Sequence, residues 1–335
     1  MLTRGVWSRL GLENGKMEPL IADAKELVLT GREASTRRKY LSYFKTFLKW
    51  ADDNLTGVKF PVSGDVFGLF LTDVSRRVNT LSTFYAHVYG VKYAHDICGY
   101  DNPALHPFPK LIIEGAKRKL SKPSESKNAI SPAIMNEICR SFGKINTSIK
   151  DLRFATMALL AYAGFLRFSE LSHIRRENLK FHDGYFSLLI PRSKTDVYNK
   201  GNEILISETG NASCPMRFLL RYLTSIEMRH DGTRGFIFRN LNPSDNSSLT
   251  ANVDLPISYT RAREELLSYL GKICQSPKQY GWHSFRHGGA TQAANAKVPD
   301  RLLKKHGRWA SDSAKNGYVH EDLVSRLSVT SGLGI

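Results

Sequence analysis

The chain of 335 residues is strongly basic, since 48 Lys and Arg against 31 Asp and Glu give a formal net charge of +17 at pH 7. Hydrophobic residues make up 41% and charged residues 24%, which is typical of a globular protein and not of a disordered one. The charge favours a polyanionic partner. Nucleic acid is favoured over a membrane, because no apolar run approaches the roughly 20 residues that a spanning helix needs. A generically basic protein is the alternative that charge alone leaves open.

The cysteines and the N-terminal residues argue against two further classes of protein. Cys98, Cys139, Cys214 and Cys274 form no C-x-x-C pair, which argues against a zinc site or a disulfide framework and for a reducing compartment. Residues 1–18 lack the apolar block of a signal peptide. We therefore expect a flexible lead-in there and a protein that is not secreted.

Amphipathic helical patterns dominate residues 19–120 and predict a compact, all-helical N-terminal domain. The clearest pattern runs from Ser35 to Trp50, where apolar residues recur at steps of three and four, as expected for packing into a core. These residues are Tyr40, Tyr43, Phe44, Phe47 and Leu48. Further helices are predicted at residues 19–30, 64–78, 80–98 and 109–120.

Basic residues gather at two places in this domain, on the remaining face of the helix that starts near Ser35 and at the end of the last helix. The candidates for contact with DNA are Arg37, Arg38, Lys45, Lys49, Lys117, Arg118 and Lys119. Phosphate contact is one interpretation of such a charged face. An ordinary solvated face is the alternative.

A polar stretch without periodicity at residues 121–130 predicts a linker to a second domain at residues 131–320. Ser131 followed by Pro132 is typical of a helix start. Two short strands flank a polar loop and are predicted at residues 186–190 and 203–206. Helices are predicted at residues 151–163, 213–228, 259–270, 286–296 and from 299 onward. The predicted fold class is therefore mainly α with a small antiparallel β-sheet.

Four segments of the second domain present arginine, lysine, histidine, tryptophan and tyrosine in a fixed order. The residues are, along the chain, Arg167 with Glu170, Arg192 with Lys194, His283 with Arg286, and Trp309 with Tyr318. Tyr318 follows Trp309 by nine residues. Each motif alone is a weak signal, because His-x-x-Arg arises by chance in many proteins, but the complete order behind a basic helical domain is specific.

This order, with its last spacing, resembles the tyrosine recombinases, also called the phage integrase family. The resemblance implies that residues 131–320 form a catalytic domain and residues 19–120 a DNA-binding, core-binding domain. The phrases Gly-Phe-Leu-Arg, Ser-Lys-Thr-Asp and His-Gly-Arg-Trp are similar to those of eukaryotic mobile-element recombinases of the Crypton-like and DIRS- or Ngaro-like groups.

The resemblance implies site-specific recombination through a covalent 3′-phosphotyrosine link, without metal, other cofactor or ATP, for integration or excision of a mobile element. Tyr318 would be the nucleophile and Lys194 the general acid. Glu170 matches an acidic residue that orients its neighbours, and Arg192 lies on the same loop as Lys194, where it is a further candidate for contact with DNA.

The chemistry of the residue types supports the same assignment. Arg167 and Arg286 suit a phosphorane-like transition state, because a guanidinium stays charged and binds phosphate oxygens through two donors. His283 is the candidate base for the tyrosine proton. Trp309 has an indole N–H that donates but cannot accept, so it would contact the phosphate or support Tyr318. The alternatives are a structural ion pair for an arginine, an exposed loop residue for Lys194 and a core tryptophan for Trp309.

The implied partner is double-stranded DNA, with a homotetramer on synapsed DNA, a monomer or dimer when free, and no membrane. Residues 321–335 would be a C-terminal tail, in which Leu323, Leu327 and Val329 dock on a neighbouring copy or pack within their own chain. The expected location is the nucleus for a eukaryotic protein and the cytoplasm otherwise. Type IB topoisomerase-like DNA relaxation is an alternative function. Non-catalytic DNA binding by a recombinase-derived protein is another, against which the intact set of site residues argues.

Overall fold

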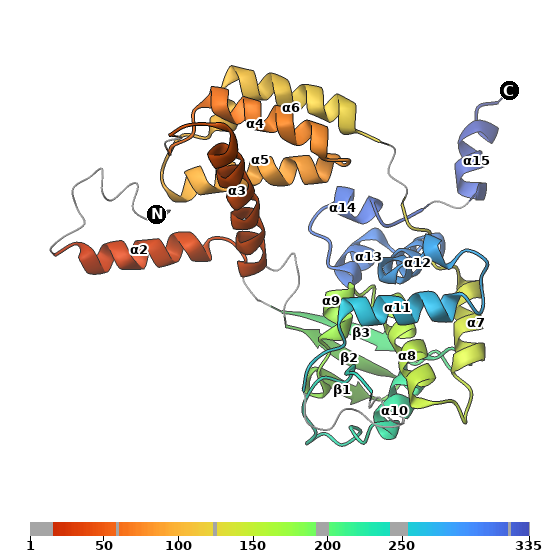
Figure 1. The fold of residues 1–335 in the computed structure, drawn as a ribbon. Helices are drawn as coiled ribbons and strands as arrows, with labels where there is room; N and C mark the ends of the chain where they lie inside the picture. Colours follow the sequence, from red (N-terminus) through yellow and green to blue (C-terminus); the bar gives the residue numbers. More distant parts are fainter. Residues whose placement is uncertain are drawn as a thin grey trace. The chain divides into compact units, whose positions relative to one another are not determined.

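The structure is a computed structural model. The chain forms two compact units, Met1–Glu125 and Ser126–Ile335 (Figure 1). The division falls within residues 121–130. The structure describes residues 16–57, 60–122, 126–191, 201–241, 254–320 and 323–334. Within these ranges, no helix is both long enough and apolar enough to cross a membrane.

The described part of the first unit is helical. Its elements are α2 (Glu18–Thr30), α3 (Ala34–Asn54), α4 (Gly64–Arg77), α5 (Leu81–Ile97), η1 (Pro103–Leu105) and α6 (Pro107–Leu120). Hydroxyl caps set two of the helix starts, because Ser63 accepts a hydrogen bond from the backbone N–H of Val66 and Thr80 accepts one from Thr83. All five helices that the sequence predicts for this domain are present.

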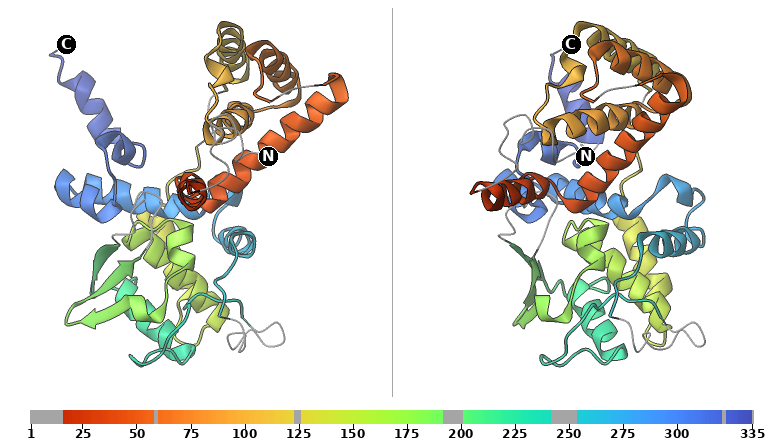
Figure 2. Two further views of the ribbon diagram at one scale, coloured as in Figure 1. Left: turned by 90° about the vertical axis from the view of Figure 1, so that its left-hand side faces the viewer. Right: turned by 60° about the vertical axis from the view of Figure 1, so that its left-hand side comes forward.

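The core of the first unit is largely aromatic. Phe47 and Phe70 meet edge to face with their ring centroids 5.1 Å apart, a favoured geometry for aromatic pairs. α4, α5 and α6 run alongside one another while α3 crosses them, as Figure 2 shows from a second side. The prediction of the apolar face of α3 is wrong at Leu48, which is 43% exposed. Ala51, one turn beyond Phe47, is buried instead.

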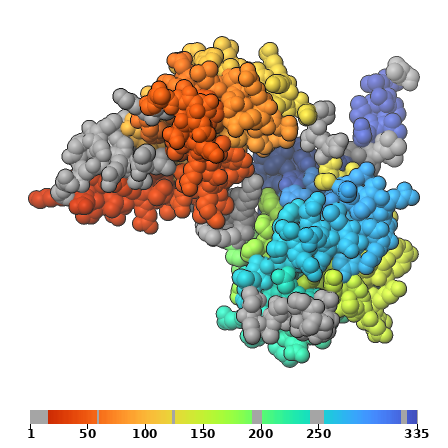
Figure 3. Space-filling view, in the orientation of Figure 1, coloured from red at the N-terminus to blue at the C-terminus, as the bar shows by residue number. Residues whose placement is uncertain are grey.

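The second unit combines helices with one small sheet. Its elements are α7 (Pro132–Phe142), α8 (Ile149–Ala163), α9 (Phe168–Ser172), η2 (Arg176–Asn178), β1 (Leu179–His182), β2 (Tyr185–Ile190), β3 (Asn202–Ser207), α10 (Pro215–Ser225), α11 (Tyr259–Leu270), η3 (Pro277–Gln279), α12 (Trp282–Asn295), α13 (Asp300–Gly307), α14 (Asp312–Asn316) and α15 (Leu323–Ser331). α11 lies on the surface of this unit in the space-filling view (Figure 3). The predicted fold class, mainly α with a small antiparallel sheet, is confirmed.

The sheet has the order β1-β2-β3, and both pairings are antiparallel. Phe186 pairs with Ile206 and Leu188 with Ile204, and all four side chains are buried. The sequence predicts β2 and β3 but misses β1, which has four residues. β1 and β2 are joined at Asp183 and Gly184, where Gly184 has a φ of 75°. Asp-Gly is a strong signal for a tight hairpin.

Helix α8 forms the centre of the second unit, with every residue from Leu152 to Ala161 buried. α7, α10 and α12 pack against it. α12 lies close to Ile130 and to Tyr162 of α8 because it carries Gly288 and Gly289. An added Cβ atom at these glycines would collide with the backbone oxygens of Ile130 and Tyr162. α12 also starts four residues before the predicted position of 286, so that it carries the whole His-x-x-Arg motif on one helix.

Candidate active site

Helix α12 and Trp309 lie next to Tyr318 in the second unit. Arg286 comes from α12, and its Cζ lies 4.7 Å from the ring centroid of Tyr318 and 4.8 Å from that of Trp309. The two aromatic rings are 5.4 Å apart, and the rings of His283 and Tyr318 are 6.3 Å apart. The structure therefore brings these four predicted site residues into one cluster.

Tyr318 follows α14, and hydrogen bonds to residues of α12 and α14 hold it in place. Its backbone N–H donates to the carbonyl of Lys315 at 2.8 Å, and its own carbonyl accepts from the hydroxyl of Thr291 on α12 at 3.3 Å. Lys304 and Asp312 form an ion pair of 3.2 Å between α13 and α14. The nucleophile candidate thus lies on a short segment with several anchors.

Glu170 joins two arginines through a buried carboxylate. Its Oε1 accepts from Arg167 Nη1 at 2.8 Å, and its Oε2 accepts from the backbone N–H of Arg167 at 2.8 Å and from Arg308 Nη2 at 2.7 Å. Burial opposes ionisation of this carboxyl group, but the charges of Arg308, Arg167 and Arg286 outweigh it and hold the pKa of Glu170 below its ordinary value. Glu170 therefore carries a negative charge at neutral pH.

Arg286 is fully buried, and its guanidinium binds two main-chain carbonyls. It donates to Phe165 O and, at 2.7 Å, to Gly307 O. Burial, with the nearby charges of Arg167 and Arg308, lowers the pKa of Arg286 to about 10. Arg286 still carries its positive charge at neutral pH, beside the Tyr318 ring.

His287 is a neighbour of Tyr318 to which the sequence assigns no role. Its ring centroid lies 4.6 Å from that of Tyr318 and 5.9 Å from that of His320. Burial and the nearby His320, His283 and Arg286 lower the pKa of His287 to about 4. Its Nδ1 is buried and has no partner among the described residues. His287 is therefore a neutral imidazole next to the tyrosine, while His283, one turn earlier on α12, is exposed.

Trp309 is buried, with 5% of its surface exposed. Its Nε1 has no hydrogen-bond partner within the described ranges. Gly307 makes room for the indole, because a Cβ atom there would overlap the Trp309 ring. The indole thus has a buried N–H donor, beside Arg286 and Tyr318, that none of the described residues uses.

Two predicted site residues, Arg192 and Lys194, lie outside the described residues. The strands on either side are described, and their ends pair at Ile190 and Asn202. The described strands on the two sides of this segment therefore end at neighbouring positions of the sheet.

The basic residues of the first unit are placed differently from one another. Arg37 Nη1 donates to the backbone carbonyl of Leu29 at 2.7 Å, so its head group holds the end of α2. The others have exposed side chains: Arg38, Lys45, Lys49, Lys117, Arg118 and Lys119. The last three occupy the final turn of α6, where positive charge is favourable.

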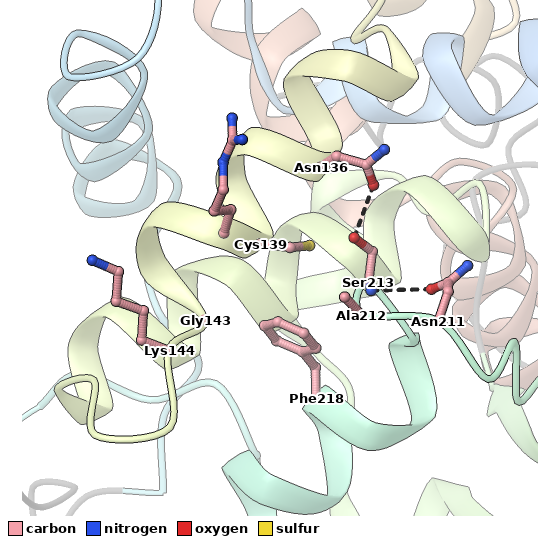
Figure 4. Close-up of a pocket in the computed structure, with 9 residues that line it drawn as sticks. Asn136, Cys139, Gly143, Lys144, Asn211, Ala212, Ser213 and Phe218 are labelled. Atoms are coloured by element: carbon pink, nitrogen blue, oxygen red, sulfur yellow. Dashed lines mark hydrogen bonds between the residues drawn. The ribbon is translucent and has the colours of Figure 1, made fainter.

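A separate groove of 610 Å³ in the second unit holds none of the predicted site residues (Figure 4). Ser213 donates from its hydroxyl to Asn136 Oδ1 at 2.8 Å and from its backbone N–H to Asn211 Oδ1 at 3.0 Å. Because these polar groups satisfy one another, the groove offers no cluster comparable to that around Tyr318.

The chain is similar to known proteins in sequence and in fold. A model described as the phage integrase family matches residues 132–323. The "Integrase/recombinase xerD homolog" of Selenomonas ruminantium is 23% identical over 308 residues, which cover 91% of this chain and 86% of that protein.

Two solved structures have a similar fold. One is the XerH site-specific recombinase bound to a palindromic difH substrate, with a TM-score of 0.57 and 15% identity over 89% of this chain and 79% of that chain. The other is the Tn1549 transposon integrase in complex with transposon right end DNA, with a TM-score of 0.55 and 14% identity over 87% of this chain and 92% of that chain. Because the family model covers more than half of the sequence, the chain belongs to the phage integrase family, the tyrosine recombinases, which are DNA strand-transferases.

Proposed function

We propose that the protein carries out site-specific recombination by cutting and rejoining DNA through a covalent 3′-phosphotyrosine intermediate on Tyr318. The observation that carries this proposal is the position of the Arg286 guanidinium, 4.7 Å from the Tyr318 ring and 4.8 Å from the Trp309 ring. A buried cation beside a phenol both attracts a phosphate and favours the phenolate that attacks it.

In the proposed reaction, Tyr318 Oη forms a bond to phosphorus while the bond from phosphorus to the 5′-oxygen breaks. His283 accepts the phenol proton, and Lys194 supplies a proton to the leaving 5′-oxygen. Arg167 and Arg286 stabilise the charge that develops on the phosphorane oxygens. A second 5′-hydroxyl then attacks the phosphotyrosine, and because the covalent link conserves the energy of the phosphodiester, rejoining needs no ATP.

The proposal predicts that Tyr318→Phe removes all covalent adducts with DNA. The test is trapping on a nicked suicide substrate followed by denaturing electrophoresis. DNA binding should change little, because the phenol oxygen is lost while the ring and its contact with Arg286 remain. Tyr259→Phe is a matched control, since Tyr259 is an exposed tyrosine of the same unit. Adducts that persist in Tyr318→Phe would falsify the assignment of the nucleophile.

We further propose that the protein acts as a homotetramer on synapsed DNA and as a monomer or dimer when free. Leu327 and Val329 on α15 are 54% and 69% exposed, which supports docking of this helix on a neighbouring copy. The side chain of Leu323, predicted for the same surface, lies outside the described side chains. Recombinant products that form only with the complete chain, and not after removal of residues 323–335, would support this assembly; equal products from both would overturn it.

The biological role that we propose is integration or excision of a mobile element of the eukaryotic type, with nuclear location in a eukaryotic host and cytoplasmic location otherwise. The phrases around Arg167, Lys194 and Trp309 support this placement, and the Tn1549 integrase is a transposon protein of similar fold. A recombination assay on paired target sites tests it. Relaxation of supercoiled DNA by single copies, with no recombinant product, would point instead to a topoisomerase-like activity.

A further inference from the structure

Arg308 closes α13 in a backbone conformation that arginine rarely adopts. Its φ is 56° and its ψ 39°, in the left-handed region, which disfavours residues with a Cβ atom. The side chain is nevertheless buried, with 2% exposed. A buried guanidinium in a disfavoured conformation persists only where its surroundings determine it strongly.

Hydrogen bonds from the Arg308 guanidinium reach three parts of the site. Nη1 donates to Gly164 O at 3.1 Å and to His306 O at 2.8 Å. Nη2 donates to Phe165 O at 2.9 Å and to Glu170 Oε2 at 2.7 Å. The loop before Arg167, the start of α9 and the end of α13 are thereby tied to one side chain.

Two of these acceptors are shared with the arginines of the proposed active site. Glu170 binds Arg308 through one oxygen and Arg167 through the other. Phe165 O accepts from both Arg308 and Arg286. Phe165 itself has a φ of 46°, so both residues joined by the Arg308–Phe165 hydrogen bond have left-handed backbone conformations. Trp309 follows Arg308 directly in the chain.

We propose that Arg308 is a positioning residue for DNA cleavage, which sets Arg167 and Arg286 relative to Trp309 and Tyr318 without touching the DNA itself. This inference rests on the proposed function. Loss of its guanidinium leaves Glu170 with Arg167 alone and leaves Phe165 O with Arg286 alone, so both arginines shift. Because small displacements in an active site strongly affect the rate, the cleavage step should slow about 100-fold.

The test is Arg308→Gly, measured by single-turnover cleavage of a nicked suicide substrate and by DNA affinity. Glycine adopts a φ of 56° without steric cost, so the substitution removes the guanidinium and keeps the backbone. Lys297→Gly is the matched control, because Lys297 is an exposed residue of the same unit with a φ of 58°. Arg308→Lys keeps the charge with fewer donors and should fall between Arg308→Gly and the natural protein.

The expected result is a slower cleavage step in Arg308→Gly, with DNA affinity changed by less than about threefold and no change in Lys297→Gly. Added methylguanidinium should restore part of the rate in Arg308→Gly, as a merely structural defect would not allow. If Arg308→Gly unfolds at the assay temperature, Arg308→Lys provides the same comparison of rate and affinity. An unchanged cleavage rate in a folded variant, or a loss confined to affinity, overturns the positioning role. Absence of any adduct with the natural protein would instead overturn the proposed function.

Discussion

Replacement of Glu170 by alanine should destabilise the second unit severely, because the carboxylate balances Arg167 and Arg308 in the interior. The side chains of Glu170 and Arg308 are each 2% exposed. Breaking a buried ion pair by removal of one partner typically costs about 3–5 kcal/mol, since the remaining charge is left without compensation. For a unit of this size, each kcal/mol corresponds to about 2–4 °C, so the unfolding temperature should fall by roughly 6–20 °C.

Differential scanning calorimetry of the complete chain provides the assay. The first unit lacks this ion pair, so its transition should stay in place and serve as an internal reference. Glu170→Gln keeps the shape of the side chain and removes the charge, and it should lose most of the same stability. A large effect of Glu170→Ala with a small effect of Glu170→Gln would show that packing, and not charge, is the main term.

The same carboxylate predicts the direction of a pH dependence. Because the folded state holds the pKa of Glu170 below its ordinary value, the unfolded carboxyl group binds a proton more readily. The stabilisation is complete above the unfolded pKa of about 4.3 and is lost as the pH falls through the folded pKa. Glu170→Gln should abolish this part of the acid dependence of unfolding.

Two histidines give further predictions. His95 is completely buried and neutral, with Nδ1 donating to Val91 O and Nε2 accepting from the N–H of Val62. Burial lowers the pKa of His95. The stabilisation that His95 gives the first unit should therefore be complete above the unfolded pKa of about 6.5, and it should be lost as the pH falls through the folded pKa. His95→Phe should cost about 1–3 kcal/mol and remove that dependence in calorimetry; an unchanged acid dependence would contradict this. His287 stays neutral down to a pH of about 4, so His287→Gln should leave the pH dependence of the cleavage rate between pH 5 and 8 unchanged. A change of that dependence in His287→Gln would contradict this.

Periodicity predicts the helices of this chain well, because each amphipathic helix presents a regular apolar face to one core. The start of α12 is harder to predict, since Gly281 lacks the side-chain cap that marks most helix starts. Its backbone N–H is instead bound by the Ser284 hydroxyl at 3.0 Å. The four-residue strand β1 is too short for an alternating pattern to stand out, although the sequence has the Asp-Gly pair of a tight turn directly after it.

The order of Arg167, His283, Arg286, Trp309 and Tyr318 could be predicted because it is a linear pattern. Glu170 was also a predicted neighbour, and it binds Arg167. The other contacts that support these residues could not be predicted, because they depend on tertiary structure. A positive φ at Phe165 or Arg308 leaves no mark in the sequence, where both positions hold ordinary side chains. The position of His287 beside Tyr318 likewise follows only once α12 is known to carry the entire motif.

The charges of the cluster explain why it suits a phosphoryl transfer. Arg167, Arg286 and Arg308 contribute three positive charges, and Glu170 contributes one negative charge, so the network itself is positive. Burial, and then the charges of Arg167 and Arg308, lower the pKa of Arg286 to about 10, so repulsion between the cations accounts for part of this shift. A bound phosphodiester supplies one negative charge, and a phosphorane-like state supplies more. In the proposed reaction, the repulsion among the arginines would therefore be relieved most in the transition state, which is the condition for catalysis by a preorganised site.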